Sequence, residues 1–118
     1  MKEGDIESLC RLEAARNGMV IWRNARGFDN QRKVTYGLGP DGASDEIGFH
    51  SVEITPDMVG KKVAIFTAIE IKKPNAKTNK ERLKKQKEFV ATIRNRGGIS
   101  GFATCPEDIP KIIKKCLT

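Results

Sequence analysis

The sequence feature that most constrains the fold is a strand-like run that passes into a helix-like one. Residues 62–73 read KVAIFTAIEIKK, a β-branched run typical of a strand, and a proline ends it. Residues 78–96 are rich in helix formers, with Thr78 or Asn79 as a suitable N-cap, and two glycines stop the pattern. A second strand-like run follows at residues 99–104. This part of the chain therefore predicts a strand–helix–strand unit.

The rest of the chain predicts the elements around that unit. Apolar residues at helical spacing before Gly18 indicate a first helix, and a proline with acids at the start and lysines at the end indicates a last one. We expect helices at residues 3–18 and 106–117, strands at residues 19–22 and 45–54, and loops at residues 23–44. The predicted order is α-β-β-β-α-β-α. The fold class is α/β, or α+β with a mixed sheet, and 118 residues predict a single domain, residues 1–118.

Two charged residues interrupt the strand-like run at residues 62–73. Side chains alternate between the faces of a strand, so Glu70 and Lys72 project together from the face that also holds Phe66 and Ala68. A buried carboxylate is costly unless it is paired or binds a metal. The pair therefore indicates a functional site, or else a salt-bridged edge or a strand end that emerges into solvent before Pro74.

Further polar residues stand where apolar ones would be expected. Asp45 lies where a glycine-rich loop enters a strand, and a hairpin with the strand of Glu70 would bring the two carboxylates together, which favours a shared proton or a divalent cation. Gln86 interrupts the apolar inner face of the second helix, which holds Leu83, Phe89, Val90 and Ile93, either as a structural amide or as a group that reaches Lys72 or DNA. In the first helix, Glu3 or Glu7 can point towards the sheet from the inner stripe that holds Ile6, Cys10 and Ala14, although acids at the start of a helix also complement its dipole.

The charge is concentrated in one segment. The net charge is +7, but residues 61–96 hold 12 basic and 3 acidic residues, and the remainder holds 10 basic and 12 acidic ones. Such a segment indicates a polyanionic partner, most simply nucleic acid, or a solvated lysine face. The chain shows neither an apolar run of membrane-spanning length nor a signal-peptide core, so we expect a protein of the cytoplasm, neither secreted nor membrane-bound.

The cysteines and the single histidine argue against other classes of site. The three cysteines, Cys10, Cys105 and Cys116, form no CxxC pair, and His50 is the only histidine. A zinc site and a disulfide framework are therefore disfavoured, and we expect reduced thiols in or near the core.

These residues, in this order, resemble the VRR-NUC (virus-type replication–repair nuclease) family of the PD-(D/E)xK nuclease superfamily, in its small stand-alone phage or bacterial form. The resemblance covers nearly the whole chain: an acid in the first helix, Ser44-Asp45 after a glycine loop, EIKKP at residues 70–74, and Gln86 in the following helix. WRN at residues 22–24 and a GG pair before the last strand also look like the phage members. Ser44 stands where the family has proline, and the helix acid is Glu3 or Glu7.

The resemblance implies a restriction-endonuclease-like core and a metal-dependent site. The implied catalytic residues are Glu3, Asp45, Glu70, Lys72 and Gln86. The implied ligands of Mg²⁺ or Mn²⁺ are Asp45, Glu70 and the carbonyl of Ile71. Lys72 would orient or deprotonate the attacking water, or stabilise the transition state. We expect the DNA-binding residues to be Arg23, Asn24, Arg26, Lys73, Lys77, Lys80, Lys84 and Lys85, with Arg82 and Lys87 on the same basic helix.

The function that follows from the resemblance is hydrolysis of phosphodiester bonds in branched double-stranded DNA, most simply as a homodimeric Holliday junction resolvase in the bacterial host cytoplasm if the protein is phage-encoded. The segments 34–38 and 54–59 are candidate dimer surfaces. Two alternatives stand beside it: a non-catalytic basic module that docks nucleic acid, and an inactive family member that acts in assembly.

Overall fold

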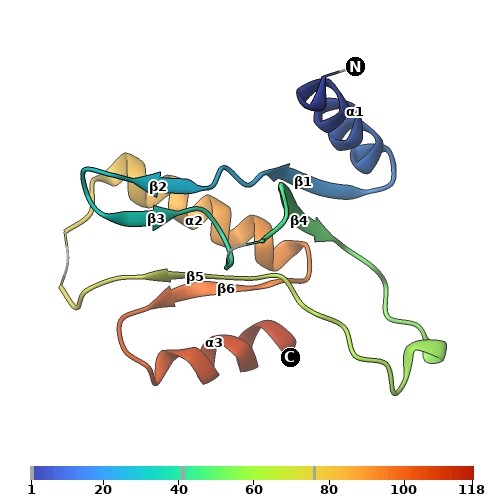
Figure 1. The fold of residues 1–118 in the computed structure, drawn as a ribbon. Helices are drawn as coiled ribbons and strands as arrows, with labels where there is room; N and C mark the ends of the chain where they lie inside the picture. The colour runs from blue at the N-terminus through green and yellow to red at the C-terminus, as the bar shows by residue number, and fades with distance from the viewer. Residues whose placement is uncertain (1, 41, 76) are drawn as a thin grey trace. The chain divides into compact units, whose positions relative to one another are not determined.

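The computed structural model describes residues 2–40, 42–75 and 77–118, which form a mixed α+β fold of helices and small sheets (Figure 1). The chain divides into two compact units, residues 1–52 and 53–118. The first unit holds α1 (Glu3–Arg16), β1 (Met19–Arg23), β2 (Gly27–Asp29), β3 (Val34–Tyr36) and β4 (Glu46–His50). The second holds the 3₁₀ turn η1 (Pro56–Met58), β5 (Thr67–Ile71), α2 (Lys80–Asn95), β6 (Ile99–Ala103) and α3 (Asp108–Leu117).

In the first unit, α1 packs on β1, and β1 pairs with β4 in an antiparallel ladder. Trp22 of β1 and Phe49 of β4 meet edge to face, with ring centroids 6.4 Å apart. Gly48 permits the close approach of the two strands, because a Cβ there would lie 1.8 Å from the carbonyl oxygen of Val20. The register aligns Arg23 with Glu46, so the chain immediately before β4 lies beside the end of β1.

A second antiparallel pair, β2 with β3, lies where we expected only a polar loop and a glycine-rich turn. Asp29 folds the connection back, since its Oδ1 accepts hydrogen bonds from the backbone N–H groups of Gln31 and Arg32. Lys33 completes the turn with a positive φ of 57°. The predicted element order therefore lacked two short strands.

In the second unit, β5 and β6 are parallel neighbours connected through α2 (Figure 1). α2 contacts both strands, and α3 contacts β6. The buried core here consists of Ile99, Ala103 and Ile112, with Ile69 and Cys116 packed against it. Because Ile69 packs towards α3, its neighbour Glu70 projects towards α2 on the other face of the strand.

The ends of α2 have the predicted chemistry. The side chain of Asn79 caps the helix by accepting hydrogen bonds from the N–H groups of Glu81 and Arg82, at 2.8 and 3.3 Å. Gly97 follows the helix with a φ of +92°, a conformation that other residues adopt at a cost. Both ends therefore match the sequence expectation.

Several local expectations were wrong. The strands at 45–54 and 62–73 do not form the hairpin that would have joined Asp45 and Glu70, because β4 pairs with β1 and β5 pairs with β6. Both strands are also shorter than expected, because each has a partner over only five residues. Phe89, expected on the inner face of α2, is 48% exposed. Cys10 and Cys105 are exposed rather than packed in the core. Within the described residues, no helix combines the length and apolar character of a membrane span.

Candidate functional site

Glu70, Lys72 and Gln86 meet at the C-terminal end of β5. The amide Nε2 of Gln86 donates a hydrogen bond to Oε1 of Glu70 at 2.9 Å. The ammonium Nζ of Lys72 lies 3.8 Å from the same oxygen. Three residues that the sequence singled out thus converge on one carboxylate oxygen, and Gln86 reaches Glu70 rather than Lys72.

The Glu70 and Gln86 side chains each have a second oxygen atom that bonds to no described residue. Among the described residues, Oε2 of Glu70 has no hydrogen bond or ion pair, and the Glu70 side chain is 37% exposed. The buried Oε1 of Gln86 also has no partner within those residues. A carboxylate held at one oxygen and open at the other suits a hard cation or a water molecule as a further partner.

Lys72 is held from a second side by the segment that enters α2. Its Nζ donates a hydrogen bond to Oγ1 of Thr78 at 3.1 Å, and only 19% of its side chain is exposed. The backbone N–H of Lys72 donates to the carbonyl of Ala103, which extends the β5–β6 ladder by one bond. The Lys72 ammonium is therefore fixed between Glu70 and Thr78.

The first unit brings together three carboxylates that the sequence also singled out. One oxygen from each of Glu3, Glu7 and Asp45 lies within 4.8 Å of the other two. The two glutamates lie one turn apart on α1, and Asp45 directly precedes β4. The choice between Glu3 and Glu7 thus has no single answer, because both reach Asp45. Acidic clusters of this kind also occur in proteins that bind no metal.

Two ion pairs orient α1 on its sheet. Arg11 donates from Nη1 to both carboxylate oxygens of Glu46, at 2.9 and 3.0 Å, and Arg23 of β1 donates to Glu7 at 3.2 Å. The Glu7 side chain is 13% exposed. The helix therefore presents a charged face to β1 and β4, and Ile6 and other apolar residues of the expected inner stripe are exposed.

The structure gives Asn24 a different role from the DNA contact we expected. The side chain is buried, and its amide nitrogen donates to the carbonyls of Leu38 and Ser44, while its oxygen accepts from the N–H of Leu38. The backbone N–H of Asn24 donates to the carbonyl of Asp45 at 2.8 Å. Asn24 thus fixes the loop that leads to Asp45, and its side chain has no group left for a phosphate.

The other predicted DNA contacts lie at the surface, with one partial exception. Arg26 is half-buried and donates from Nη1 to the carbonyl of Pro40. Arg23 is exposed but paired with Glu7. The lysines of the group are all exposed: Lys73, Lys77, Lys80, Lys84 and Lys85.

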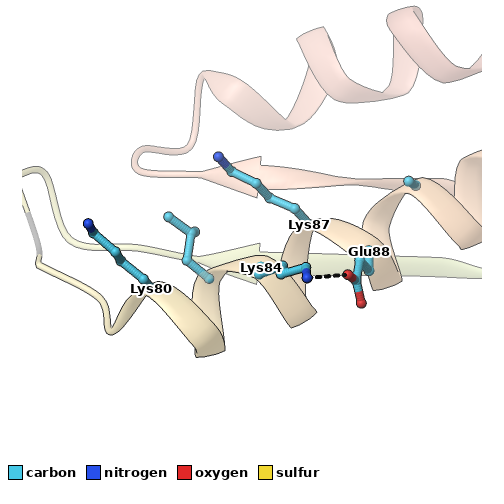
Figure 2. A pocket seen from close by; sticks show the side chains of 6 residues that line it. Lys80, Lys84, Lys87 and Glu88 are labelled. Atoms are coloured by element: carbon cyan, nitrogen blue, oxygen red, sulfur yellow. Dashed lines mark ion pairs between the residues drawn. The ribbon is translucent and has the colours of Figure 1, made fainter.

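A shallow groove runs along one side of α2, as Figure 2 shows. Its lining consists of three lysines, one glutamate and two apolar residues: Lys80, Leu83, Lys84, Lys87, Glu88 and Ala91. Lys84 forms an exposed ion pair with Glu88 at 4.0 Å. Lys85 is 100° round the helix from Lys84, so the lysines of α2 do not form one surface.

Sequence reasoning missed two partners of the candidate residues. Thr78 was recognised as a possible helix cap but not as the acceptor for Lys72, and no spacing rule signals a contact across a turn of this kind. We expected Arg23 to bind DNA, but it pairs with Glu7. An arginine on the strand that directly follows an acidic helix was the sequence signal that could have indicated this ion pair.

Comparison with known proteins adds no relative: no family model, no curated protein and no solved structure matches this chain.

Proposed function

We propose that the protein is a metal-dependent endonuclease that hydrolyses phosphodiester bonds in branched double-stranded DNA, with a restriction-endonuclease-like core of the VRR-NUC type. The substrate that fits the proposal best is a four-way (Holliday) junction, resolved by a homodimer. The alternative is a non-catalytic module that docks nucleic acid through its lysines.

One observation carries the catalytic reading. Gln86 and Lys72 both address the same oxygen of Glu70, and the other oxygen of that carboxylate is open. A purely structural salt bridge has no need of an amide from a neighbouring helix on the same oxygen. A docking module would need only the exposed lysines, so this arrangement favours an enzyme.

The resemblance to the VRR-NUC family assigns Asp45, Glu70 and the carbonyl of Ile71 as ligands of Mg²⁺ or Mn²⁺, ions that prefer carboxylate, carbonyl and water oxygens. The cation would supply a water of lowered pKa and charge stabilisation at the phosphate. Lys72 would orient that water or stabilise charge on the phosphate, and Gln86 would orient Glu70.

The carboxylates of the first unit offer oxygen donors of the same kind. Glu3 and Glu7 lie beside Asp45, with one oxygen of each within 4.8 Å of the other two, and these carboxylates would hold a hard divalent cation through oxygen atoms. Arg23, which pairs with Glu7, offsets part of the repulsion among the three acids.

The proposal is tested by divalent-dependent cleavage across a panel of DNAs: linear duplex, flap, three-way and four-way junctions. Wild-type protein should cut branched DNA in Mg²⁺ or Mn²⁺ and be inactive in EDTA. Asp45→Asn, Glu70→Gln and Lys72→Ala should each abolish cutting while DNA binding survives, because affinity comes from the lysines. Glu81→Gln, an exposed acid in the first turn of α2, is the matched control. Wild-type cutting by Glu70→Gln would refute the nuclease assignment.

A further inference from the structure

The lysines of α2 divide into distinct surfaces, and one of them has a groove. The groove face contains Lys80, Lys84 and Lys87, which all lie at the surface (Figure 2). They recur at steps of four and three residues, the spacing that keeps side chains on one side of a helix. The inner side of α2 is occupied by Val90 and Ile93, which are buried.

The charge of this face is unbalanced. Glu88 is the single acid in the lining, and Lys84 already pairs with it. Neither Lys80 nor Lys87 takes part in an ion pair with any described residue. The whole second unit repeats the imbalance, with 15 basic and 7 acidic residues between 53 and 118, against 7 and 8 in residues 1–52. A polyanion is the complementary partner.

The lysine spacing suits a strand of duplex nucleic acid. Lys80 and Lys87 are seven residues apart, which is about 10 Å along a helix axis. Over that length each strand of a B-form duplex presents about three phosphates, at 3.4 Å of rise each. Three lysines can therefore meet three successive phosphates when α2 lies along a duplex arm.

Other anionic partners fit this face less well. A helix that lies on a membrane needs a large apolar face, but only Leu83 and Ala91 stand between these lysines, and Leu83 is half-buried. An acidic helix that docked here would need several apolar anchor pockets at helical spacing, and the same two residues are all that the lining offers.

We propose that the face formed by Lys80, Lys84 and Lys87, and not Lys85 further round the helix, is the surface that holds the phosphate backbone of one duplex arm. This inference deepens the proposed function and rests on it for the identity of the polyanion. In this role the face positions the duplex and does not read its sequence, because phosphate contacts carry no sequence information.

The test is DNA binding in EDTA, where cleavage plays no part. The full-length triple variant K80A/K84A/K87A is compared with K111A/K114A/K115A, which removes three exposed lysines from α3 of the same unit. Alanine preserves helix propensity in both. Each lost phosphate contact lowers the salt slope by about 0.9, so the α2 variant should lose a slope of about 2.7 on linear duplex. When the salt is raised from 50 to 200 mM, the affinity of both proteins falls, and the factor by which the variant's affinity falls should be roughly 40 times smaller than the factor for wild type.

Two further variants test the assignment of the face. Glu88→Gln removes the acid and should raise duplex affinity, whereas Lys85→Ala should lower the slope by less than Lys84→Ala does. Equal slopes for wild type and the α2 variant would overturn the inference, and so would an equal loss in the α3 variant. Binding of the wild type to anionic vesicles but not to duplex would also overturn it. A wild type that binds duplex through this face and never cuts would refute the nuclease proposal alone.

Discussion

Gln86 of α2 donates a hydrogen bond from Nε2 to Oε1 of Glu70 in β5, across a gap of sixteen residues in the sequence and 2.9 Å in space. The bond leaves the second oxygen of Glu70 as the one available for a cation. An amide in this position fixes the rotamer of the carboxylate without competing for its charge.

The first prediction concerns this amide. Gln86→Ala should reduce cleavage by roughly 10- to 100-fold and raise the Mg²⁺ concentration needed for half-maximal activity, as removal of a group that orients a metal ligand does. Metal titrations of the cleavage rate measure both effects. The chain's other glutamine, Gln31, lies in the turn between β2 and β3, and Gln31→Ala should match wild type. An unchanged metal dependence in Gln86→Ala would leave Gln86 a structural amide.

The second prediction concerns Thr78, whose hydroxyl accepts a hydrogen bond from Lys72. A hydrogen bond to a charged group contributes about 1.5–3 kcal/mol, so Thr78→Val should lower kcat by at most roughly 10- to 100-fold. Thr78→Ser should restore it, because the serine keeps the hydroxyl. DNA affinity in EDTA should be the same in both variants, since Thr78 acts through Lys72.

The matched control for Thr78 is Thr92, whose hydroxyl donates a hydrogen bond to the carbonyl of Glu88 in its own helix. Thr92→Val should cleave at the wild-type rate. If Thr78→Val does so too, Lys72 needs no support from the segment that enters α2.

The third prediction tests whether the proposed ligands Asp45 and Glu70 bind a cation. Fe²⁺ that replaces Mg²⁺ produces hydroxyl radicals with ascorbate and peroxide, and these cut the polypeptide close to the ion. We expect fragments that end near Asp45 and near Glu70, and loss of the fragments near Glu70 in Glu70→Gln. Cutting confined to the neighbourhood of Glu3, Glu7 and Asp45 would show that those acids bind a cation without Glu70.

The sequence predicted local features of α2, β5 and β6 correctly, but it did not predict which face of α1 packs on the sheet. The caps of α2, the strand after Gly98 and the alternation of Ile69 and Glu70 followed from local rules, because capping and periodicity act over a few residues. The inner face of α1 did not follow. Its orientation depends on the Arg11–Glu46 pair, a contact 35 residues apart that hydrophobic periodicity cannot register.

The sequence also indicated part of the candidate site and missed the rest. The sequence indicated Glu70, Lys72 and Gln86 as residues out of place, and they lie together. It could not indicate that Asn24 is buried, because an asparagine whose amide bonds to Leu38 and Ser44 looks the same in a sequence as an exposed one. The short β2–β3 pair was also missed, since three-residue strands hold too few residues to show a period.

The fourth prediction concerns pH and the start of α3. The backbone N–H of Thr104 donates a hydrogen bond to Oδ2 of Asp108 at 2.9 Å, and this bond holds the pKa of the carboxyl below its ordinary value. A lowered folded-state pKa means that the ionised form stabilises the fold. That contribution is present above the unfolded-state pKa of about 3.9 and is lost as the pH falls through the lower folded-state value.

Asp108→Ala should therefore lower Tm at neutral pH, and its difference from wild type should shrink as the pH falls below about 4. Thermal unfolding by circular dichroism between neutral and acidic pH measures this. Glu107→Ala, at the neighbouring exposed position, is the control and should show a smaller change at every pH. A Tm difference for Asp108→Ala that is independent of pH would assign the effect to packing instead of charge.

The last prediction concerns assembly. One active site cuts one strand at a time, whereas a four-way junction is close to two-fold symmetric, so paired nicks call for two sites related by a dyad. A C2 homodimer is the commonest way for a small chain to supply them. The two segments expected at its interface are exposed: Val34, Tyr36 and Leu38 are each about half exposed, and Ile54 and Val59 are 77% and 85% exposed.

We therefore expect a dimer in sedimentation or light scattering at micromolar concentration, and paired, symmetric nicks in a four-way junction. Val59→Asp should weaken the dimer without unfolding the chain, because the native side chain is almost fully exposed. Lys62→Asp, also at an exposed position of the same unit, controls for the added negative charge. The weakened dimer should still nick single strands while paired cutting falls, since each protomer keeps its own carboxylates. A stable wild-type monomer that prefers flaps to four-way junctions would contradict the resolvase reading and leave a structure-specific nuclease that nicks one strand.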